Sequence, residues 1–200
     1  MADKASLSNL PCTIFHERLR GSLRLLSEPR TSNAGEILSQ REFPRQPLVG
    51  VGAVVVNDDG QVLLIKRGTE PMLGHWSLPG GLLELGETLA EGVKREVFEE
   101  TGLIVTPQAI VEVVDRIYRN SDGEKPQVRY HYVVVDFWCR VIDGQLKPSS
   151  DATDVAWVSH AEWKDSNFYS LDSIAVQVIE KGWQMAQEAG KCSGANFFGG

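Results

Sequence analysis

The sequence predicts a single α/β sandwich domain. Its 200 residues, 42% of them apolar, provide enough side chains for one buried core. Apolar runs of strand length alternate along the chain with two segments of helical periodicity, which is typical of a sheet covered by helices. Charge divides the chain, since residues 1–45 carry a net charge of +2 and the remainder −9. We therefore expect an N-terminal extension over 1–45, the domain over 46–188 and a flexible tail over 189–200.

Five strands are expected. An almost continuous apolar run over 49–56 is followed by the sequence NDDG and a second run over 61–65, which predicts a hairpin with an Asp-Gly turn. A polar loop over 121–126 separates two longer runs. The remaining strands are expected over 105–114, 129–141 and 155–158.

Two helices are expected in the domain. The first covers 88–101, where Thr88 and Glu91 have the spacing of a capping box and Gly102 stands where a helix commonly ends. The second covers 171–186, whose apolar residues repeat at helical period. It is expected to close the domain.

The N-terminal extension has apolar residues at roughly helical spacing with arginines between them, which predicts an amphipathic helix. An Arg/Ser-rich transit peptide is the alternative, and Glu17 and Glu28 argue against it. The chain lacks both an apolar signal segment and a run of 18 apolar residues, so export and membrane insertion are not expected. Three widely spaced cysteines suggest free thiols. A cytoplasmic location is predicted.

The overall charge restricts the partners. The chain has 20 basic and 27 acidic residues, a net charge of −7. An acidic surface repels phosphate backbones and anionic lipids, so neither nucleic acid nor a membrane is expected as the main partner. A small molecule is the expected ligand.

One cluster of carboxylates points to chemistry. Glu96, Glu99 and Glu100 are spaced i, i+3, i+4 and project from one face of the predicted helix. They repel one another and lie near the end of the helix where the dipole disfavours anions. A bound cation would relieve both costs, and hard carboxylate oxygens suit Mg²⁺ or Mn²⁺. A solvated acidic face is the alternative.

The residues around this cluster carry a family resemblance. Before the helix stands the sequence LPGG, whose glycines allow the backbone to approach a ligand closely. Residues 81–103 read G-x5-E-x7-REVFEETGL. This stretch resembles the signature of the Nudix hydrolase family at every defining position. The resemblance extends over roughly 47–185.

The resemblance implies a Nudix-type α/β/α sandwich with a mixed central sheet and a catalytic loop-helix-loop. It implies Mg²⁺-dependent hydrolysis of a nucleoside diphosphate linked to another moiety, with Mn²⁺ as a possible substitute. The metal positions that it implies are Gly81, Glu96, Glu99 and Glu100.

Further roles follow from the same resemblance. Arg95 becomes an orienting partner of the glutamates, and Glu87 reaches the metal or holds the loop. The general base is one of the glutamates or a late carboxylate, Asp151 or Asp154. A polar loop is the alternative interpretation of the late carboxylates.

Substrate contacts are less specific. Arginines that could pair with phosphates are Arg45, Arg67, Arg116, Arg119 and Arg129. Aromatic residues that could stack on a ring are Trp76, Tyr118 and Tyr130. Packing or a place on the solvated surface is the alternative for each.

The sequence resembles the prokaryotic ADP-ribose pyrophosphatase-like group through 44–47 and 130–137. This favours ADP-ribose or a related nucleoside-diphosphate sugar, cleaved to AMP and ribose 5-phosphate. A proline often found after the signature in that group is absent, since Arg119 stands near its place. The alternatives are a (deoxy)nucleoside triphosphate pyrophosphohydrolase and a non-catalytic Nudix-fold sensor. A homodimer is compatible with the resemblance.

Overall fold

The computed structural model describes residues 41–120, 127–148 and 152–194. All of these residues belong to one compact unit. The predicted N-terminal helix lies outside the described residues. The proposed boundary at residue 45 therefore stays a prediction.

Seven strands of the described part form one mixed sheet in the order β3-β2-β1-β6-β5, with β4 paired to β1 and β7 paired to β2. The β1–β6 pair is parallel and the other pairs are antiparallel. The strands are β1 (Leu48–Val56), β2 (Val62–Arg67), β3 (Trp76–Ser77), β4 (Gly80–Leu82), β5 (Leu103–Asn120), β6 (Gln127–Gly144) and β7 (Ala152–Val158).

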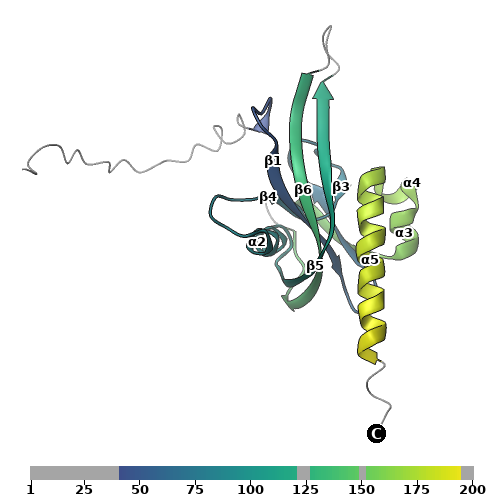
Figure 1. Ribbon diagram of the computed structural model, residues 1–200. Helices are drawn as coiled ribbons and strands as arrows, with labels where there is room; N and C mark the ends of the chain where they lie inside the picture. The colour runs from purple at the N-terminus through teal and green to yellow at the C-terminus, as the bar shows by residue number, and fades with distance from the viewer. Residues whose placement is uncertain (1–40, 121–126, 149–151, 195–200) are drawn as a thin grey trace, which may run out of the picture. The chain divides into compact units, whose positions relative to one another are not determined.

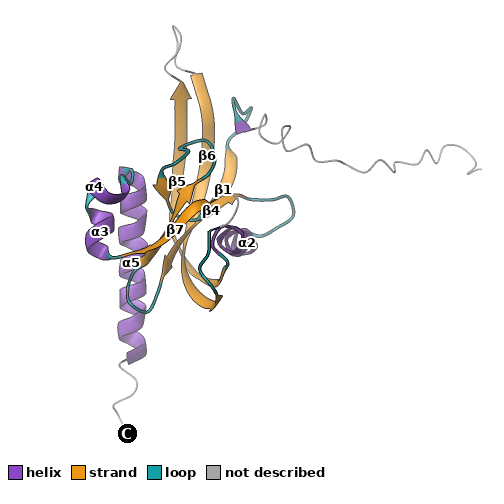
Figure 2. Ribbon diagram, turned by 180° about the vertical axis from the view of Figure 1, so that it is seen from behind, coloured by secondary structure: helices purple, strands orange, loops and turns teal. Residues whose placement is uncertain are grey.

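Helices cover both faces of this sheet. In Figures 1 and 2, α2 lies on one side of the strands, and α5 with α3 and α4 lies on the other. The predicted α/β/α sandwich with a mixed central sheet is confirmed. The helices are α2 (Leu89–Thr101), α3 (His160–Lys164), α4 (Ser166–Tyr169) and α5 (Ser173–Gly194).

Alternation along β1 explains the two hydrophobic layers. Val51, Ala53 and Val55 pack in the cluster that contains the buried residues of α2. Val54 and Val56 point to the opposite face and pack in the cluster of α5. Because successive strand residues face opposite sides, a continuous apolar run serves two cores at once.

The β5–β6 ribbon is longer than the sequence analysis predicted. Each strand has 18 residues, so β5 continues six residues past Val114. The prediction stopped there because charged residues begin to alternate with apolar ones. In the structure the side chains of this stretch are alternately exposed and half-buried, as in a ribbon with one solvated face. Residues 119, 120, 127 and 128, which lie outside the strands predicted from sequence, belong to these strands.

The last helix is also longer than predicted. It begins at Ser173 after its N-cap, Asp172, whose side chain accepts a hydrogen bond from the amide of Ala175 at 2.9 Å. It continues to Gly194, past the expected domain end at 188. Among the described residues, no helix is both long and apolar enough to cross a membrane. A cytoplasmic location stays a prediction.

Candidate active site

The local sequence fixes both ends of α2. Thr88 and Glu91 form the predicted capping box, in which the Glu91 carboxylate accepts from the Thr88 amide at 2.8 Å. Gly102 adopts a φ of 71°, and its amide donates to Phe98 O at 2.8 Å. The two caps fix where the helix starts and stops. They thereby set which residues face the loop that precedes it.

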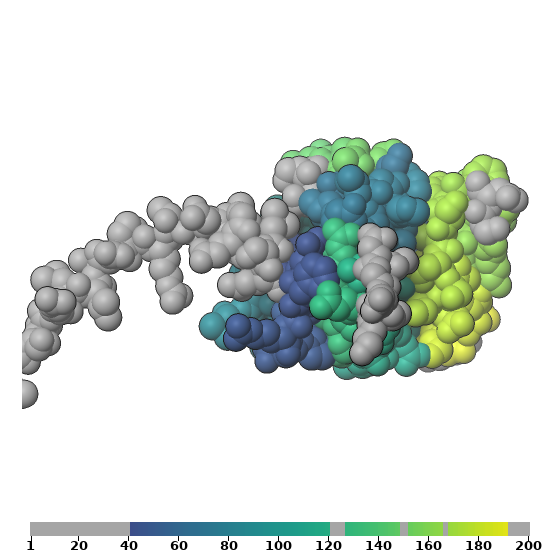
Figure 3. Space-filling view, turned by 90° about the horizontal axis from the view of Figure 1, so that it is seen from above, coloured from purple at the N-terminus to yellow at the C-terminus, as the bar shows by residue number. Residues whose placement is uncertain are grey.

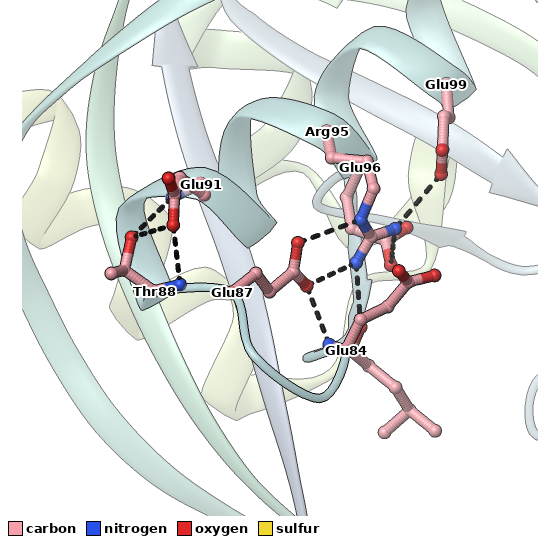
Figure 4. A network of polar contacts seen from close by, with 8 residues as sticks. Glu84, Glu87, Thr88, Glu91, Arg95, Glu96 and Glu99 are labelled. Atoms are coloured by element: carbon pink, nitrogen blue, oxygen red, sulfur yellow. Dashed lines mark hydrogen bonds and ion pairs between the residues drawn. The ribbon is translucent and has the colours of Figure 1, made fainter. Parts of the chain in front are cut away.

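Arg95 holds several carboxylates together on that face (Figure 4). Its Nη2 and Nε donate to the two oxygens of Glu87 at 2.7 and 3.1 Å. Its Nη1 donates to Glu96 at 2.9 Å and to Glu99 at 3.1 Å. Nη2 also donates to Leu82 O at 3.0 Å, so one guanidinium ties the helix to β4. These charge-assisted bonds restrict the rotamers of the carboxylates.

Burial and charge act in opposite directions at this cluster. Burial raises the pKa of Glu96, and the neighbouring charges of Arg95 and Arg41 partly oppose that rise. Hydrogen bonds from Arg95 lower the pKa of Glu87. The same partners raise the pKa of Arg95 above its ordinary value, so it stays charged.

Glu100 and Glu96 each contact one residue of the glycine pair Gly80-Gly81. The Glu100 side chain is buried, and its Oε2 accepts a hydrogen bond from the amide of Gly80 at 2.8 Å. The Cα of Gly81 lies against the Glu96 carboxylate, so a β-carbon at this position would collide with it. The predicted metal positions are thus neighbours, with the glycine pair facing the glutamates.

The donor set fits a hard divalent cation, because it consists of carboxylate oxygens. Among the residues that the structure describes, no three acidic, histidine or cysteine side chains converge on a point that could hold a metal ion. Arg95 Nη1 bridges Glu96 and Glu99 instead. Coordination by all three glutamates therefore requires side-chain rotation. Glu99, whose side chain is 54% exposed, can rotate without unpacking the core.

A cavity adjoins the glutamate face through Gly80 and Gly81, which belong to its wall. Much of the remaining wall comes from β5, β6, the 67–72 segment and the start of α5. Its polar and aromatic lining consists of Arg41, Arg67, Glu70, Ser77, Arg116, Tyr118, Tyr132, Asp136 and Asp172.

Two of the cavity arginines already have partners. Arg116 Nη1 lies 2.7 Å from both carboxylate oxygens of Asp172, the N-cap of α5. Arg67 Nε donates to Pro71 O at 2.9 Å. The charge of Arg116 is thereby balanced by the carboxylate of Asp172. Among the described residues, the Arg67 side chain has only a backbone carbonyl as its partner, so its charge and its other donors face the cavity.

Asp136 is an unusual member of this wall. It is only 4% exposed, and its carboxylate lies over Gly52, where a β-carbon would collide with it. It accepts no hydrogen bond from the described residues. Burial raises its pKa to about 6, opposed in part by the charge of Arg116. A buried carboxylate without a donor costs free energy, and such groups concentrate at functional sites.

The other predicted substrate residues are more scattered. Tyr118 lines the cavity, where its hydroxyl contacts Met72 Sδ at 3.4 Å. Arg45 and Arg119 are exposed and do not belong to the cavity wall. Trp76 packs edge-on against Tyr169, with ring centroids 5.1 Å apart.

The remaining candidates lie away from the glutamates or outside the described residues. Arg129 and Tyr130 both bind Glu42. Asp154 is exposed on β7, opposite Lys66 of β2. Asp151 falls outside the described residues.

Sequence reasoning missed Asp136, Tyr132 and Arg41. A signal for Asp136 was present, because it is an acidic residue within the apolar run of β6. Tyr132 shares its strand face by the two-residue period. Nothing in the sequence around Arg41 marks it as a wall residue.

The site's geometry agrees with a comparison of the whole chain with family models. The NUDIX domain model matches residues 46–177. The chain belongs to the Nudix hydrolase family. Its signature helix is α2, and the match begins five residues after Arg41, the first described residue.

The chain is similar to several curated proteins whose names differ. The chain is 35% identical over 144 residues to the ADP-ribose pyrophosphatase of Methanocaldococcus jannaschii, covering 70% of the chain and 74% of that protein. It is 39% identical over 114 residues to the MutT-like protein of Streptomyces ambofaciens, covering 57% and 65%. It is 34% identical to the mouse 8-oxo-dGDP phosphatase NUDT18, of which it spans 34%.

Solved Nudix structures have the same fold. A NUDIX hydrolase from Nitrosomonas europaea has a TM-score of 0.56 at 26% identity, over 68% of this chain and 88% of that one. The NUDIX domain of Shewanella oneidensis NrtR complexed with ADP ribose has a TM-score of 0.54 at 24% identity, over 77% and 99%. The second likeness concerns the fold alone.

Proposed function

We propose that this Nudix hydrolase cleaves a nucleoside diphosphate linked to a sugar, with ADP-ribose as the first candidate and AMP and ribose 5-phosphate as products. The observation that carries the proposal is a polar cavity that shares Gly80 and Gly81 with the glutamate face of α2. A diphosphate at that junction leaves room for its second substituent in the cavity. The similarity to an ADP-ribose pyrophosphatase supports the same class.

Mg²⁺ or Mn²⁺ is the proposed cofactor, held by Glu96, Glu99 and Glu100. When bound, it neutralises phosphate charge and lowers the pKa of a bound water. The chain contributes orientation, because Arg95 fixes Glu96 and Glu99 and the Gly80 amide fixes Glu100. The proton of the attacking water passes to one of these glutamates or to Asp151.

The cavity offers groups for the part of the substrate beyond the phosphates. An ionised Asp136 only accepts hydrogen bonds, so it suits the hydroxyl donors of a ribose. Tyr118 and Tyr132 supply aromatic surface in the same wall. Arg67 has donors left for a phosphate oxygen. The proposed pocket is thus assigned largely to paired strands of the sheet.

ADP-ribose should exceed dGTP and ATP in kcat/KM by at least about tenfold, or about 1.4 kcal/mol of transition-state stabilisation. The second ribose gains contacts in the cavity that a triphosphate lacks. The experiment compares the three nucleotides at equal Mg²⁺ and resolves the products by chromatography. AMP and ribose 5-phosphate are expected from ADP-ribose.

Other outcomes would identify the alternatives. Preference for a triphosphate with release of pyrophosphate would identify a (deoxy)nucleoside triphosphate pyrophosphohydrolase. Tight binding of ADP-ribose without turnover would instead identify a sensor. Either result would contradict the proposed substrate. Preference for a triphosphate would still leave Glu96, Glu99 and Glu100 as the proposed metal ligands.

A further inference from the structure

One residue of the active-site cavity precedes the part of the chain that matches the family model. The match starts at residue 46, yet Arg41 already lines the cavity. Figure 3 shows the first described residues, coloured purple, against the green atoms of β6. Arg41 therefore belongs structurally to the site, although it lies outside the matched domain.

One donor of Arg41 has no acceptor among the described residues. Its Nε is buried and has no hydrogen-bond partner. No ion pair links Arg41 to any described residue. This includes the acidic residues of the same wall, Glu70, Asp136 and Asp172. A buried guanidinium nitrogen without an acceptor is unfavourable, so an acceptor from outside the chain would improve the site.

The position of Arg41 suggests which acceptor. Arg41 lines the same cavity as Gly80 and Gly81, the glycine pair that adjoins the glutamate face. The cavity that Arg41 lines therefore meets the glutamate face at this pair. A diphosphate bridging these two regions would bring anionic oxygens to the guanidinium fork, which matches phosphate geometry.

A separate set of contacts holds this segment in place. Glu42 Oε1 accepts from Arg129 Nη2 at 2.7 Å, from Arg129 Nε at 3.2 Å and from the Tyr130 hydroxyl at 2.5 Å. The amide of Phe43 donates to Arg129 O at 2.8 Å. Hydrogen bonds from Tyr130 and Arg129 lower the pKa of Glu42, so it stays charged. The residue next to Arg41 is thereby clamped to β6.

We propose that Arg41 binds a phosphate oxygen of the substrate and that Glu42 is a positioning residue that holds Arg41 at the cavity. The identity of the ligand rests on the proposed function, whereas the place of Arg41 does not. Arg41 and Glu42 lie within residues 1–45, which the sequence predicts to be an extension apart from the domain. Part of this extension is thereby assigned to substrate binding.

Arg41→Gln tests the first part. Loss of one charge-assisted contact should raise KM for ADP-ribose about 10–100-fold and leave kcat within about threefold, because the contact exists before and during the reaction. Arg140→Gln, at an exposed position of β6, is the matched control and should retain the wild-type KM. Inorganic pyrophosphate should show the same loss of affinity in Arg41→Gln by calorimetry.

The two readouts separate the proposals. If the wild-type protein cleaves no nucleoside diphosphate but Arg41→Gln weakens pyrophosphate binding, the proposed function fails and the role of Arg41 stands. If the wild type is active and Arg41→Gln equals Arg140→Gln in both KM and pyrophosphate affinity, the role of Arg41 is overturned.

Glu42→Ala tests the clamp. It should raise KM about 3–10-fold in the wild-type background and have no further effect in the Arg41→Gln background, because Glu42 acts through Arg41. A melting curve checks that each variant is folded. An equal effect in both backgrounds would overturn the positioning role, since a general loss of stability does not depend on Arg41.

Discussion

Glu100→Gln should lower kcat by about 10²–10⁴ and leave the protein folded, the usual effect of losing a general base or a key electrostatic group. Gln keeps an oxygen that can accept the Gly80 amide, so the 2.8 Å hydrogen bond at the end of α2 can persist. What it removes is the negative charge beside the glycine pair. Initial rates with ADP-ribose at saturating Mg²⁺ measure the change.

Two controls make this result specific to the glutamate face. Glu91→Gln alters the same helix, but Gln also completes a capping box, so the rate should stay at the wild-type level. The wild-type protein in excess EDTA gives the metal-free rate. An unchanged rate in Glu100→Gln would remove Glu100 from the site, and full turnover in EDTA would contradict the metal.

Much of this glutamate face was predictable because its determinants are local in sequence. Thr88, Glu91 and Gly102 fix the helix through contacts within four residues, so the start, the end and the exposed face of α2 follow from spacing. The family signature lies in the same stretch. Local rules and the signature therefore agree on where Glu96, Glu99 and Glu100 lie.

The cavity was less predictable because its wall is assembled by pairing between distant strands. Asp136 lies opposite Gly52 of β1, and Arg116 opposite Tyr132, each through the register of the sheet. No pattern within a single segment specifies that register for an 18-residue ribbon with several irregularities. Arg41 lies next to Glu42, which binds Arg129, 87 positions further along the chain.

Asp136 carries a cost that depends on pH. Its pKa is about 6 in the folded protein against an ordinary value of 3.8, because burial disfavours the charged form. Between these values the folded state binds more protons than the unfolded state, so stability decreases as pH rises through this window. A shift of about two units corresponds to about 3 kcal/mol at neutral pH. A chain that retains this cost at a cavity wall is expected to use the carboxylate for a ligand.

Asp136→Asn should therefore gain stability relative to the wild type as pH rises, by about 2 kcal/mol between pH 4 and pH 7. The amide cannot ionise, so it escapes the penalty that the carboxylate meets above pH 4. Any fixed cost of burying the amide cancels when the two pH values are compared. Urea denaturation at both pH values measures the difference, with Asp58→Asn in the exposed turn after β1 as the control for the change in net charge. If the difference in free energy of unfolding between Asp136→Asn and the wild type is the same at both pH values, ionisation of Asp136 does not destabilise the folded protein.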